Sequence, residues 1–364
     1  MKIDGIAYRS VWVDPQDGWS VHIFDQTRLP WALDILRLTD VAQAEYAIRN
    51  MQVRGAPLIG AVAAYGVCLA LRADPSSEAM ECDCAFLADA RPTAVNLSWA
   101  IGRMLTRLRN TRVEDRVAAA YAEAAAIADE DAAQCAAIGR HGAPLIAEVA
   151  ARRPRGPVQV LTHCNAGWLA TVDWGTALAP IYTAFEQGID LHVWVDETRP
   201  RNQGAALTAW ELGKHGVAHT VIADNAGGHL MQHGEVDLVI VGTDRVTANG
   251  DVANKIGTYL KALAAHDNGV PFWVATPSTT IDRNVRDGVA EIPIEARSGD
   301  ELSLVTGRTA TGAIETVRIT PDGSAAANPA FDVTPARLVT GLITERGRCP
   351  ATDAGMVSLF PEWR

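Results

Sequence analysis

Two side chains in the part of the sequence after residue 150 have the types and the placement that proton transfer needs. The first, Cys164, follows the apolar run 158–161 and stands beside Asn165. An isolated cysteine is most often a small buried hydrophobe, but a thiol at a strand end can act as a base or a nucleophile once its pKa is lowered. We expect the N-terminus of a following helix to lower the pKa of Cys164.

The second side chain is Asp244, which follows the apolar run 238–241 where the sequence becomes polar. Two interpretations of this carboxyl remain open. Desolvation at a strand end would raise the pKa of Asp244 until the carboxyl is protonated near neutral pH and can donate its proton. An ion pair with the neighbouring Arg245 would lower that pKa instead.

Three cations lie close to predicted helix starts. Arg54 precedes one helix, Arg91 precedes a second, and Lys255 lies near the start of a third. Taken singly, each is equally well explained as a solvated side chain or part of an ordinary cap. The chain is acidic, with 32 Lys and Arg against 43 Asp and Glu and a net charge of −11, so an anionic ligand needs local positive charge. Helix N-termini with nearby cations supply it, and together the three predict an anion site.

The sequence excludes several classes of function. An acidic chain without blocks of Lys and Arg is a poor binder of nucleic acid or anionic membranes. No G-x-G-x-x-G or G-x-x-x-x-G-K-[ST] pattern follows a predicted strand, which excludes dinucleotide and P-loop sites. His163 has no second His or Cys at ligand spacing, and Cys82 with Cys84 forms only a weak two-ligand pair. We therefore predict no cofactor, no metal ion, no nucleic-acid partner and no membrane.

The cysteines and the N-terminal residues bear on location. The six cysteines are irregularly spaced and form no C-x-x-C pair, which is typical of reduced thiols in a cytosol. The N-terminal residues MKIDGIAYRS lack the apolar core of a signal peptide. The longest apolar run, 56–71, is shorter than the roughly 20 residues of a membrane span. We expect a cytoplasmic protein in which this run is a buried helix.

The elements that must position these residues differ between the two halves of the chain. Residues 6–24 alternate between apolar and polar types and contain turn-forming residues, which predicts a small hairpin. Residues 39–150 show helical three-and-four spacing of apolar residues, with breaks near 73–75 and 90–92. Beyond a linker rich in Pro and Arg at 151–157, short apolar runs alternate with helix-length segments. These runs are 158–161, 191–195, 218–222, 238–241 and 272–275.

This pattern predicts an α/β protein with two domains. We expect a mainly helical N-terminal domain (1–150) with a small hairpin, which contributes phosphate-binding residues. The C-terminal domain (151–364) is expected to be catalytic and Rossmann-like, a parallel sheet with helices on both faces. In such sheets ligands bind at the carboxyl ends of the strands. A polar cluster follows each of the predicted strands, which favours an active site over a purely structural domain.

Segments distributed along the chain resemble, in order, the methylthioribose-1-phosphate isomerase family of methionine salvage. They are VRGAPLIG, RPTAVNLSWA, LTHCNAG, DETRPRNQGAALTAWEL, GTDRVTANGDVANKIGTY, VPFWVATPSTTID, IPIEARSGDEL and NPAFDVTPARLVTGLITERG. Because the resemblance covers nearly the whole chain, it is more specific than any single motif. It implies a cofactor-independent aldose–ketose isomerase that acts as a homodimer and converts 5-methylthioribose 1-phosphate to 5-methylthioribulose 1-phosphate.

The resemblance also implies roles for individual residues. It makes Asp244 the proton donor and Cys164 the reactive cysteine. It assigns substrate contacts to Arg54, Gly55, Ala56, Arg91, Gln203, Asn254 and Lys255. Since a 1-phosphate has no free anomeric hydroxyl, Asp244 would protonate the ring oxygen to open the ring. The Cys164 thiolate would then take the C2 proton or polarise a hydride shift.

The sequence departs from the family pattern in places. Trp168 stands where the family usually has a small residue, Ala206 replaces a usual arginine, and 304–320 differs from the usual run. We expect the Trp168 indole to lie near the pocket and to change the space around C5 of the sugar. Alternatives are therefore an isomerase of 5-deoxyribose 1-phosphate or of ribose 1,5-bisphosphate, although the missing arginine argues mildly against the bisphosphate.

A further alternative comes from a different class. The same superfamily contains non-catalytic regulatory subunits of the translation factor that exchanges guanine nucleotide, and these subunits are binding proteins. The presence of both Cys164 and Asp244, together with the phosphate-binding residues, favours an enzyme.

Overall fold

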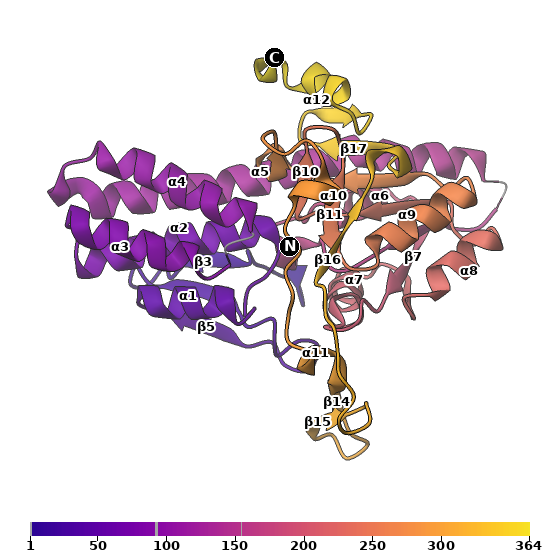
Figure 1. Cartoon of the computed structure of the whole chain (residues 1–364), viewed down its shortest axis with the longest axis horizontal. Helices are drawn as coiled ribbons and strands as arrows, with labels where there is room; N and C mark the ends of the chain where they lie inside the picture. Colours follow the sequence, from indigo (N-terminus) through magenta and orange to yellow (C-terminus); the bar gives the residue numbers. More distant parts are fainter. Residues whose placement is uncertain (1, 92–93, 154) are drawn as a thin grey trace.

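The computed structural model describes residues 2–91, 94–153 and 155–364 of the chain. A helical part lies beside an α/β part built on a large sheet, and a two-stranded arm projects from the α/β part (Figure 1). Pro92 and Thr93, at the predicted start of the second helix, and Pro154, in the predicted linker, lie outside the described residues.

The N-terminal part is a helical bundle with a small antiparallel sheet. Its strands β3 (Val11–Val13), β4 (Val21–Phe24) and β5 (Ile35–Leu38) pair in sequence order, which confirms the predicted hairpin as β3–β4. A shorter hairpin, β1 (Lys2–Ile3) with β2 (Ile6–Ala7), precedes it. The helices of the bundle are α1 (Val41–Arg49), α2 (Ala56–Ala73), α3 (Ser77–Ala88), α4 (Val95–Arg109) and α5 (Arg116–Arg152).

The helix α2 forms the centre of this bundle. It is long and apolar enough to cross a membrane by length and composition, a test that core helices of soluble proteins also pass, and 83% of it is buried inside the fold. It packs against α1, α3, α4 and α5, which bury small and aliphatic side chains on all of its sides. The prediction that the apolar run 56–71 is a buried helix is confirmed.

The helix α5 joins the two parts of the molecule. It is 37 residues long, and its residue Ile127 packs in the core of the bundle. Further along, Ile138 packs in the core of the large sheet together with α6 (Leu178–Glu186). A Cβ added to Gly142 of α5 would lie 2.4 Å from Cγ of Pro180 in α6, so the two helices touch through this glycine. The domain boundary at residues 150 and 151 stays a prediction.

Replacing Gly142 with alanine is expected to lower the free energy of unfolding by about 1–3 kcal/mol, because the added methyl group has no room against Pro180. Gly102 of α4 is the matched control, since the position of its Cβ is open and the residue is exposed. Gly102→Ala should raise stability by about 0.5–1 kcal/mol. Urea unfolding followed by circular dichroism measures both changes, and equal effects would contradict the close packing of α5 on α6.

The α/β part is built on a seven-stranded sheet with the order β18-β17-β12-β9-β6-β7-β8. All neighbours run parallel except the edge pair β17–β18. The five predicted strands are confirmed as β6 (Val158–Thr162), β7 (Leu191–Asp196), β8 (His219–Ile222), β9 (Leu238–Val241) and β12 (Phe272–Ala275). Two further strands of this sheet, β17 (Gly341–Thr344) and β18 (Gly347–Cys349), were not predicted from the sequence.

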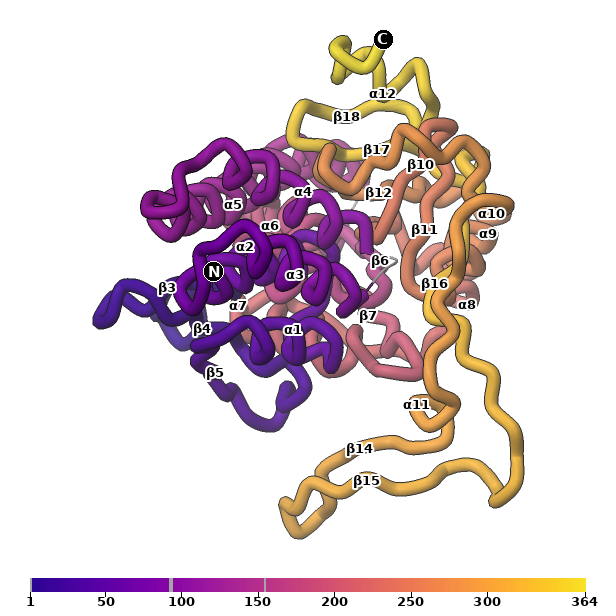
Figure 2. The backbone as a smooth tube through the Cα atoms, turned by 60° about the vertical axis from the view of Figure 1, so that its left-hand side comes forward, coloured from indigo at the N-terminus to yellow at the C-terminus, as the bar shows by residue number. Residues whose placement is uncertain are grey.

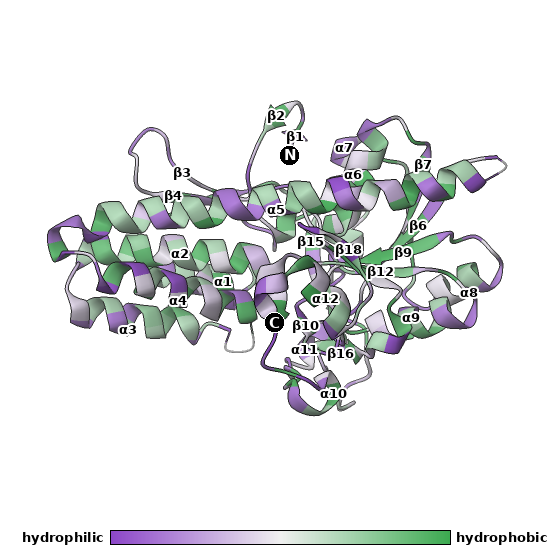
Figure 3. Ribbon diagram, turned by 90° about the horizontal axis from the view of Figure 1, so that it is seen from above, coloured by the Kyte–Doolittle hydropathy of each residue, from purple (hydrophilic) through white to green (hydrophobic). Residues whose placement is uncertain are grey.

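Helices cover both faces of this sheet. Figure 3 shows α5, α6 and α7 (Ala209–His215) on one side of β9 and β12, and α8 (Ala226–Gln232) with α9 (Thr258–Asp267) on the other. Successive strand residues point to opposite faces, so Ile240 joins the core under α6 and Val239 joins the core under α9. The predicted α/β class, a parallel sheet with helices on both faces, is confirmed.

A second, four-stranded sheet was not predicted. Its order is β13-β10-β11-β16, and its strands are β10 (Arg245–Thr247), β11 (Val252–Lys255), β13 (Ile281–Asp282) and β16 (Phe331–Thr334). The strands β10 and β11 pair antiparallel, and the backbone N–H of Asp244 donates to the Ala253 carbonyl at 3.0 Å. This hairpin therefore places Asp244 and the end of β11 side by side.

The projecting arm contains the segment in which the sequence departs from the family. It is the antiparallel pair β14 (Leu304–Arg308) and β15 (Ile314–Arg318), and Figure 2 shows it extending from α11 (Asp300–Ser303) away from the body. The remaining helices of this part are α10 (Gly288–Glu291) and α12 (Asp353–Leu359).

Candidate active site

One cavity collects the residues that the sequence assigns to the site. The helical part contributes the start of α2 and the loop before α4, and the α/β part contributes the segments after β6, β7 and β9 and the strand β11. Every candidate lines the cavity: Arg54, Gly55, Ala56, Arg91, Cys164, Gln203, Asp244, Asn254 and Lys255. The structure therefore brings together residues that lie up to two hundred positions apart in the chain.

Cys164 lies in a constrained backbone conformation directly after β6. Its φ is +63°, which is uncommon for a residue with a side chain and marks stored strain at many functional sites. Two hydroxyls hold it there: Thr198 Oγ1 accepts from the Cys164 N–H at 2.8 Å, and Thr208 Oγ1 donates to the Cys164 carbonyl at 2.7 Å. The thiol is buried, with 8% of the residue exposed.

The expectation that the N-terminus of a helix follows Cys164 is wrong. The chain continues into a single 3₁₀ turn, Trp168–Ala170, which is too short to supply a helix dipole. Burial raises the pKa of the Cys164 thiol, and the positive charges of Arg54 and Lys255 oppose this rise. Two side-chain cations thus take the place of the helix as the groups that favour the thiolate.

The two interpretations of Asp244 are separated by its surroundings. Burial raises the pKa of the Asp244 carboxyl, and the charges of Lys255, Arg91 and Arg54 offset part of the rise. The neighbouring Arg245 forms an ion pair with Asp282 at 3.4 Å. The raised pKa of Asp244 agrees with the desolvated, proton-donating interpretation.

The start of α2 provides an anion-binding surface. Gly55 is its N-cap, with a φ of +93° and no side chain to cap the helix. A Cβ on Gly55 would lie 2.3 Å from the Ala170 carbonyl, so glycine is required where α2 meets the loop that follows β6. Gly55 and Ala56 line the cavity, and no side chain caps their N–H groups, while Pro57 has no N–H to offer. An uncapped helix start of this kind is a usual place for a bound phosphate.

Arg54 is locked beside this helix start. It is 7% exposed, its NH1 donates to Asn165 Oδ1 at 2.5 Å, and its NH2 donates to the Asn165 carbonyl at 2.5 Å. Asn165 was not singled out as a site residue, although it follows Cys164 directly. It sets the direction of the Arg54 guanidinium.

The other two cations also have protein partners. Lys255 Nζ donates to the Ala330 carbonyl at 3.0 Å and lies 4.4 Å from the ring centre of Phe331, and burial lowers the pKa of Lys255. Arg91 NH2 donates to Glu295 Oε2 at 3.1 Å. An ammonium and a guanidinium each carry more donors than these contacts use, so both cations retain donors for an anion.

Two polar atoms of lining residues lack a hydrogen-bond partner among the residues described. These atoms, Gln203 Oε1 and Arg91 Nε, are buried. Buried polar groups are normally paired, so unpaired atoms on residues that line a cavity indicate a polar ligand. Asn254, which also lines the cavity, donates from Nδ2 to Thr258 Oγ1 at 3.0 Å. The side-chain oxygen of Asn254 is left as an acceptor.

A larger cavity of about 510 Å³ adjoins the first and shares Met51, Arg54 and Gln203 with it. Much of its lining is apolar, and two acids, Asp300 and Glu301, add negative charge. The other apolar lining residues include Leu29, Pro30, Trp31, Ala205, Ala206, Leu207, Leu304 and Val305. Ala206, which replaces the arginine usual in the resembled family, therefore presents only a methyl group to this cavity.

The expectation that Trp168 lies near the pocket is wrong. The indole is fully buried and is absent from the lining of both cavities among the residues described. It packs against Phe24 at 5.8 Å and Trp210 at 6.0 Å between ring centres. Trp168 therefore fills the core beneath the loop, and Ala206 is the departure that reaches the space beside the site.

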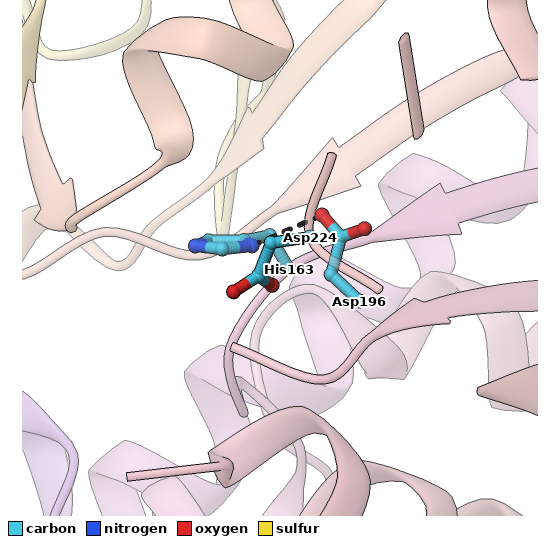
Figure 4. A group of neighbouring side chains, drawn as sticks. All are labelled: His163, Asp196 and Asp224. Carbon is cyan, nitrogen blue, oxygen red and sulfur yellow. Dashed lines mark hydrogen bonds and ion pairs between the residues drawn. The ribbon is translucent and has the colours of Figure 1, made fainter. Parts of the chain in front are cut away.

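His163, Asp196 and Asp224 form a cluster of neighbouring polar side chains (Figure 4). Their candidate ligand atoms lie within 4.8 Å of one another, a grouping that sequence spacing did not reveal because three different strands contribute to it. Asp196 Oδ2 lies 3.1 Å from His163 Nδ1 and 3.2 Å from Lys261 Nζ, and His163 Nε2 lies 2.9 Å from the Ile256 carbonyl. Asp196 Oδ2 and both ring nitrogens of His163 thus face protein partners, whereas Asp196 Oδ1 is buried without a hydrogen-bond partner among the residues described.

The polar residues after β8 support the site from outside. Asp224 accepts hydrogen bonds from the backbone N–H groups of Thr198 and Arg199, both at 2.7 Å. Thr198 in turn accepts from the N–H of Cys164. The polar residues after β8 therefore do not line the cavity themselves. They fix the loop after β7, which in turn binds the backbone of Cys164.

The loop after β6 is also anchored by a buried acid in α5. Asp131 Oδ2 accepts from the Val172 N–H at 2.7 Å, and burial raises the pKa of Asp131 to about 7. A folded-state pKa above the unfolded value means that the folded protein holds a proton which the unfolded chain releases. Stability contributed by Asp131 is therefore present at low pH and is lost as the pH rises from about 4 to about 7.

Asp131→Asn should remove this pH dependence, since an amide does not titrate and its oxygen can still accept from Val172. We expect the variant to gain up to about 4 kcal/mol relative to the original protein between pH 4 and pH 8. Urea unfolding at a series of pH values measures the difference. Parallel stability profiles for the two proteins would contradict a raised pKa of Asp131.

Known proteins resemble the chain along nearly all of its length. The sequence pattern of the Initiation factor 2 subunit family matches residues 52–351. The methylthioribose-1-phosphate isomerase of Gluconobacter oxydans (strain 621H) is 68% identical over 363 residues, which cover 100% of this chain and 99% of that protein. The protein of the same name from Acidiphilium cryptum (strain JF-5) is 66% identical over 362 residues and covers 100% and 98%.

Solved structures with two different names share the fold. The crystal structure of 5-methylthioribose 1-phosphate isomerase from Pyrococcus horikoshii OT3 matches with a TM-score of 0.82 and 38% identity, over 98% of this chain and 96% of that chain. The translation initiation factor eIF-2B, subunit delta, from A. fulgidus matches with a TM-score of 0.80 and 38% identity, over 98% and 100%.

Proposed function

The chain belongs to the Initiation factor 2 subunit family and, within it, groups with isomerases; we propose that it converts 5-methylthioribose 1-phosphate to 5-methylthioribulose 1-phosphate in methionine salvage. The observation that carries this proposal is the composition of one cavity. A desolvated carboxyl and a thiol lie there beside three cations and an uncapped helix start. A cytoplasmic location and a homodimer are further parts of the proposal.

The reaction needs an acid before the hydrogen at C2 can move. Because the phosphate occupies the anomeric oxygen, the ring opens when Asp244 gives its proton to the ring oxygen and the C1–O bond breaks toward that oxygen. C1 is then electron-deficient and still carries the phosphate. The raised pKa of Asp244 supports this role, since it keeps the proton on the carboxyl at a higher pH.

Cys164 acts at the next step. In one route its thiolate removes the C2 proton, C1 and C2 form an enol phosphate, the Cys164 thiol returns a proton to C1, and the Asp244 carboxylate takes the proton of the C2 hydroxyl as the ketone forms. In the other route the C2 hydrogen moves to C1 with its electron pair, the thiolate stabilises the positive charge that develops at C2, and the Asp244 carboxylate again takes the proton of the C2 hydroxyl. Both routes need the thiolate, which Arg54 and Lys255 favour.

The phosphate has a distinct binding region in this proposal. Arg54, Arg91 and Lys255 provide positive charge, and the N–H groups of Gly55 and Ala56 at the start of α2 provide hydrogen bonds. Gln203 and Asn254 are left for the sugar hydroxyls. Their side chains provide acceptors inside the cavity, and Gln203 Oε1 has no other partner among the residues described.

The adjoining cavity bears on the substituent at C5. Its apolar residues and the acids Asp300 and Glu301 favour an uncharged methylthio group over a second phosphate, because a buried phosphate beside carboxylates is costly. Arg201, the further cation in its lining, pairs with Glu301 at 2.9 Å. This supports the methylthio sugar over ribose 1,5-bisphosphate, with 5-deoxyribose 1-phosphate as a second substrate.

A non-catalytic regulatory subunit is the second candidate function. It is favoured by the eIF-2B subunit delta of A. fulgidus, which is 38% identical to the chain over nearly its whole length. Such a protein would bind a sugar phosphate or a nucleotide in the same cavity and leave it unchanged, so turnover separates the two candidates.

The deciding experiment is phosphorus and proton NMR of the purified protein with 5-methylthioribose 1-phosphate in deuterated water. We expect the 1-phosphoketose to appear, and deuterium at C1 would indicate transfer through an exchanging base. Ribose 1,5-bisphosphate and 5-deoxyribose 1-phosphate are run in parallel to define the C5 substituent. If none of the three compounds is converted, the proposed isomerase activity is contradicted and the role of a regulatory subunit is favoured.

A further inference from the structure

Glu211 of α7 is a fully buried carboxyl that the proposed mechanism does not use. Its Oε1 accepts from Asn165 Nδ2 at 2.9 Å and from the Leu169 N–H at 3.0 Å. Its Oε2 accepts from the Trp168 N–H at 2.9 Å and from the Tyr182 hydroxyl at 3.1 Å. Burial raises the pKa of Glu211 to about 7, and these hydrogen bonds oppose the rise. All four contacts use Glu211 as an acceptor.

Asn165 connects this carboxyl to the cavity. Its Nδ2 points to Glu211, and its Oδ1 accepts from Arg54 NH1. An amide has one donor end and one acceptor end. Glu211 Oε1 at 2.9 Å and Thr208 Oγ1 at 3.2 Å both accept from Asn165 Nδ2, so the oxygen of Asn165 faces the guanidinium, and Glu211 provides the shorter of the two contacts. A donor in place of Glu211 would favour the opposite orientation, in which the NH₂ group of Asn165 opposes Arg54.

The backbone around Glu211 allows this contact. Residues Gly204–Thr208 form a π-helical turn immediately before α7, and such turns occur frequently at functional sites. From this turn Thr208 donates to the Cys164 carbonyl. On the opposite side, a Cβ added to Gly167 would lie 1.9 Å from Glu211 Oε2, so only glycine lets the loop rest directly on the carboxylate.

We propose that Glu211 is a positioning residue for the isomerase: through Asn165 it orients the Arg54 guanidinium for phosphate, and through Trp168 and Leu169 it holds the loop that carries Cys164. The inference rests on the proposed function for the reaction, but its first step concerns only the binding of phosphate. Among the residues described, Glu211 does not itself line the substrate cavity, and it reaches the cavity through Asn165, which does.

Glu211→Gln tests the proposal because it keeps the size of the side chain and replaces one acceptor oxygen with a donor. We expect the KM for 5-methylthioribose 1-phosphate and the Kd for inorganic phosphate, measured by calorimetry, each to rise at least tenfold. Tyr182→Phe is the matched control, since it removes one hydrogen bond to the same carboxylate without changing Asn165. Its phosphate Kd should stay within about threefold of the original value.

A double-mutant cycle separates positioning from a general loss of structure. If Glu211 acts through Arg54, then Glu211→Gln should weaken phosphate binding less than twofold in an Arg54→Lys background. A tenfold loss in both backgrounds would overturn the proposal. So would an unchanged phosphate Kd in Glu211→Gln, even if its Tm is lower.

A second variant covers the case in which Glu211→Gln does not fold. Asn165→Ala removes the connection and leaves the other three contacts of Glu211 in place, so it should raise the phosphate Kd to the same extent; an unchanged Kd would overturn the proposal. Failure of the proposed reaction is a separate result: a protein that binds phosphate without isomerising the sugar still tests Glu211. Absence of phosphate binding by the unmodified protein would overturn both.

Discussion

Asp244→Asn is expected to lower kcat for 5-methylthioribose 1-phosphate by about 10²–10⁴-fold, the usual contribution of a positioned general acid. Asparagine has the same size and can still donate a hydrogen bond to the ring oxygen, but it cannot transfer a proton to it. Substrate affinity should change by less than about fivefold, because the cations that hold the phosphate are untouched. Steady-state kinetics and calorimetry measure the two quantities.

Asp282→Asn is the control for this variant. Asp282 lies in β13, pairs with the neighbouring Arg245 and does not line the site cavity among the residues described. We expect this variant to keep at least half of the original kcat. An unchanged kcat in Asp244→Asn, or an equal loss of kcat in both variants, would contradict the role of Asp244 as the general acid.

Cys164→Ser is expected to have an effect of similar size, a fall in kcat of about 10²–10⁴-fold. Serine fits the strained position after β6, but its hydroxyl is far less acidic than a thiol, so Arg54 and Lys255 no longer stabilise an anion there. Turnover and substrate affinity are measured as for Asp244, and affinity should again be nearly unchanged.

The exposed Cys82 provides the matched control. Cys82→Ser should retain full activity, which shows that the loss is specific to the thiol at the strand end. If Cys164→Ser turns over substrate at more than a tenth of the original rate, the thiolate takes no direct part in moving the C2 hydrogen.

Prediction from sequence succeeded for elements whose type and position follow from a pattern of neighbouring residues. The five parallel strands are short runs such as Leu238–Val241, which are buried throughout and bounded by polar residues. Because parallel strands present their carboxyl ends at one edge, this pattern also located Cys164 and Asp244. The resemblance then supplied Gln203 and Asn254, whose positions no spacing rule indicates.

Prediction failed where the environment is made by distant segments. A following helix was expected to lower the pKa of Cys164, but the cations of α2 and β11 occupy that role. Trp168 was placed by its nearness to Cys164 in sequence, yet the chain turns after Gly167 and buries the indole against Phe24. The second sheet was missed because its short strands are not continuous apolar runs: Arg245 begins β10, and Lys255 ends β11.

The helix α5 has a mechanical consequence for the protein. At about 1.5 Å per residue, its 37 residues make a rod of about 55 Å that is embedded in the cores of both parts. Pro144 removes one backbone hydrogen bond inside this helix, but the packing of the helix in both cores couples the two halves of the binding cavity. We therefore expect the protein to melt in a single cooperative event. Separately expressed halves should aggregate, because one would carry α5 with an uncovered apolar side and the other would lack the helix that covers part of its core.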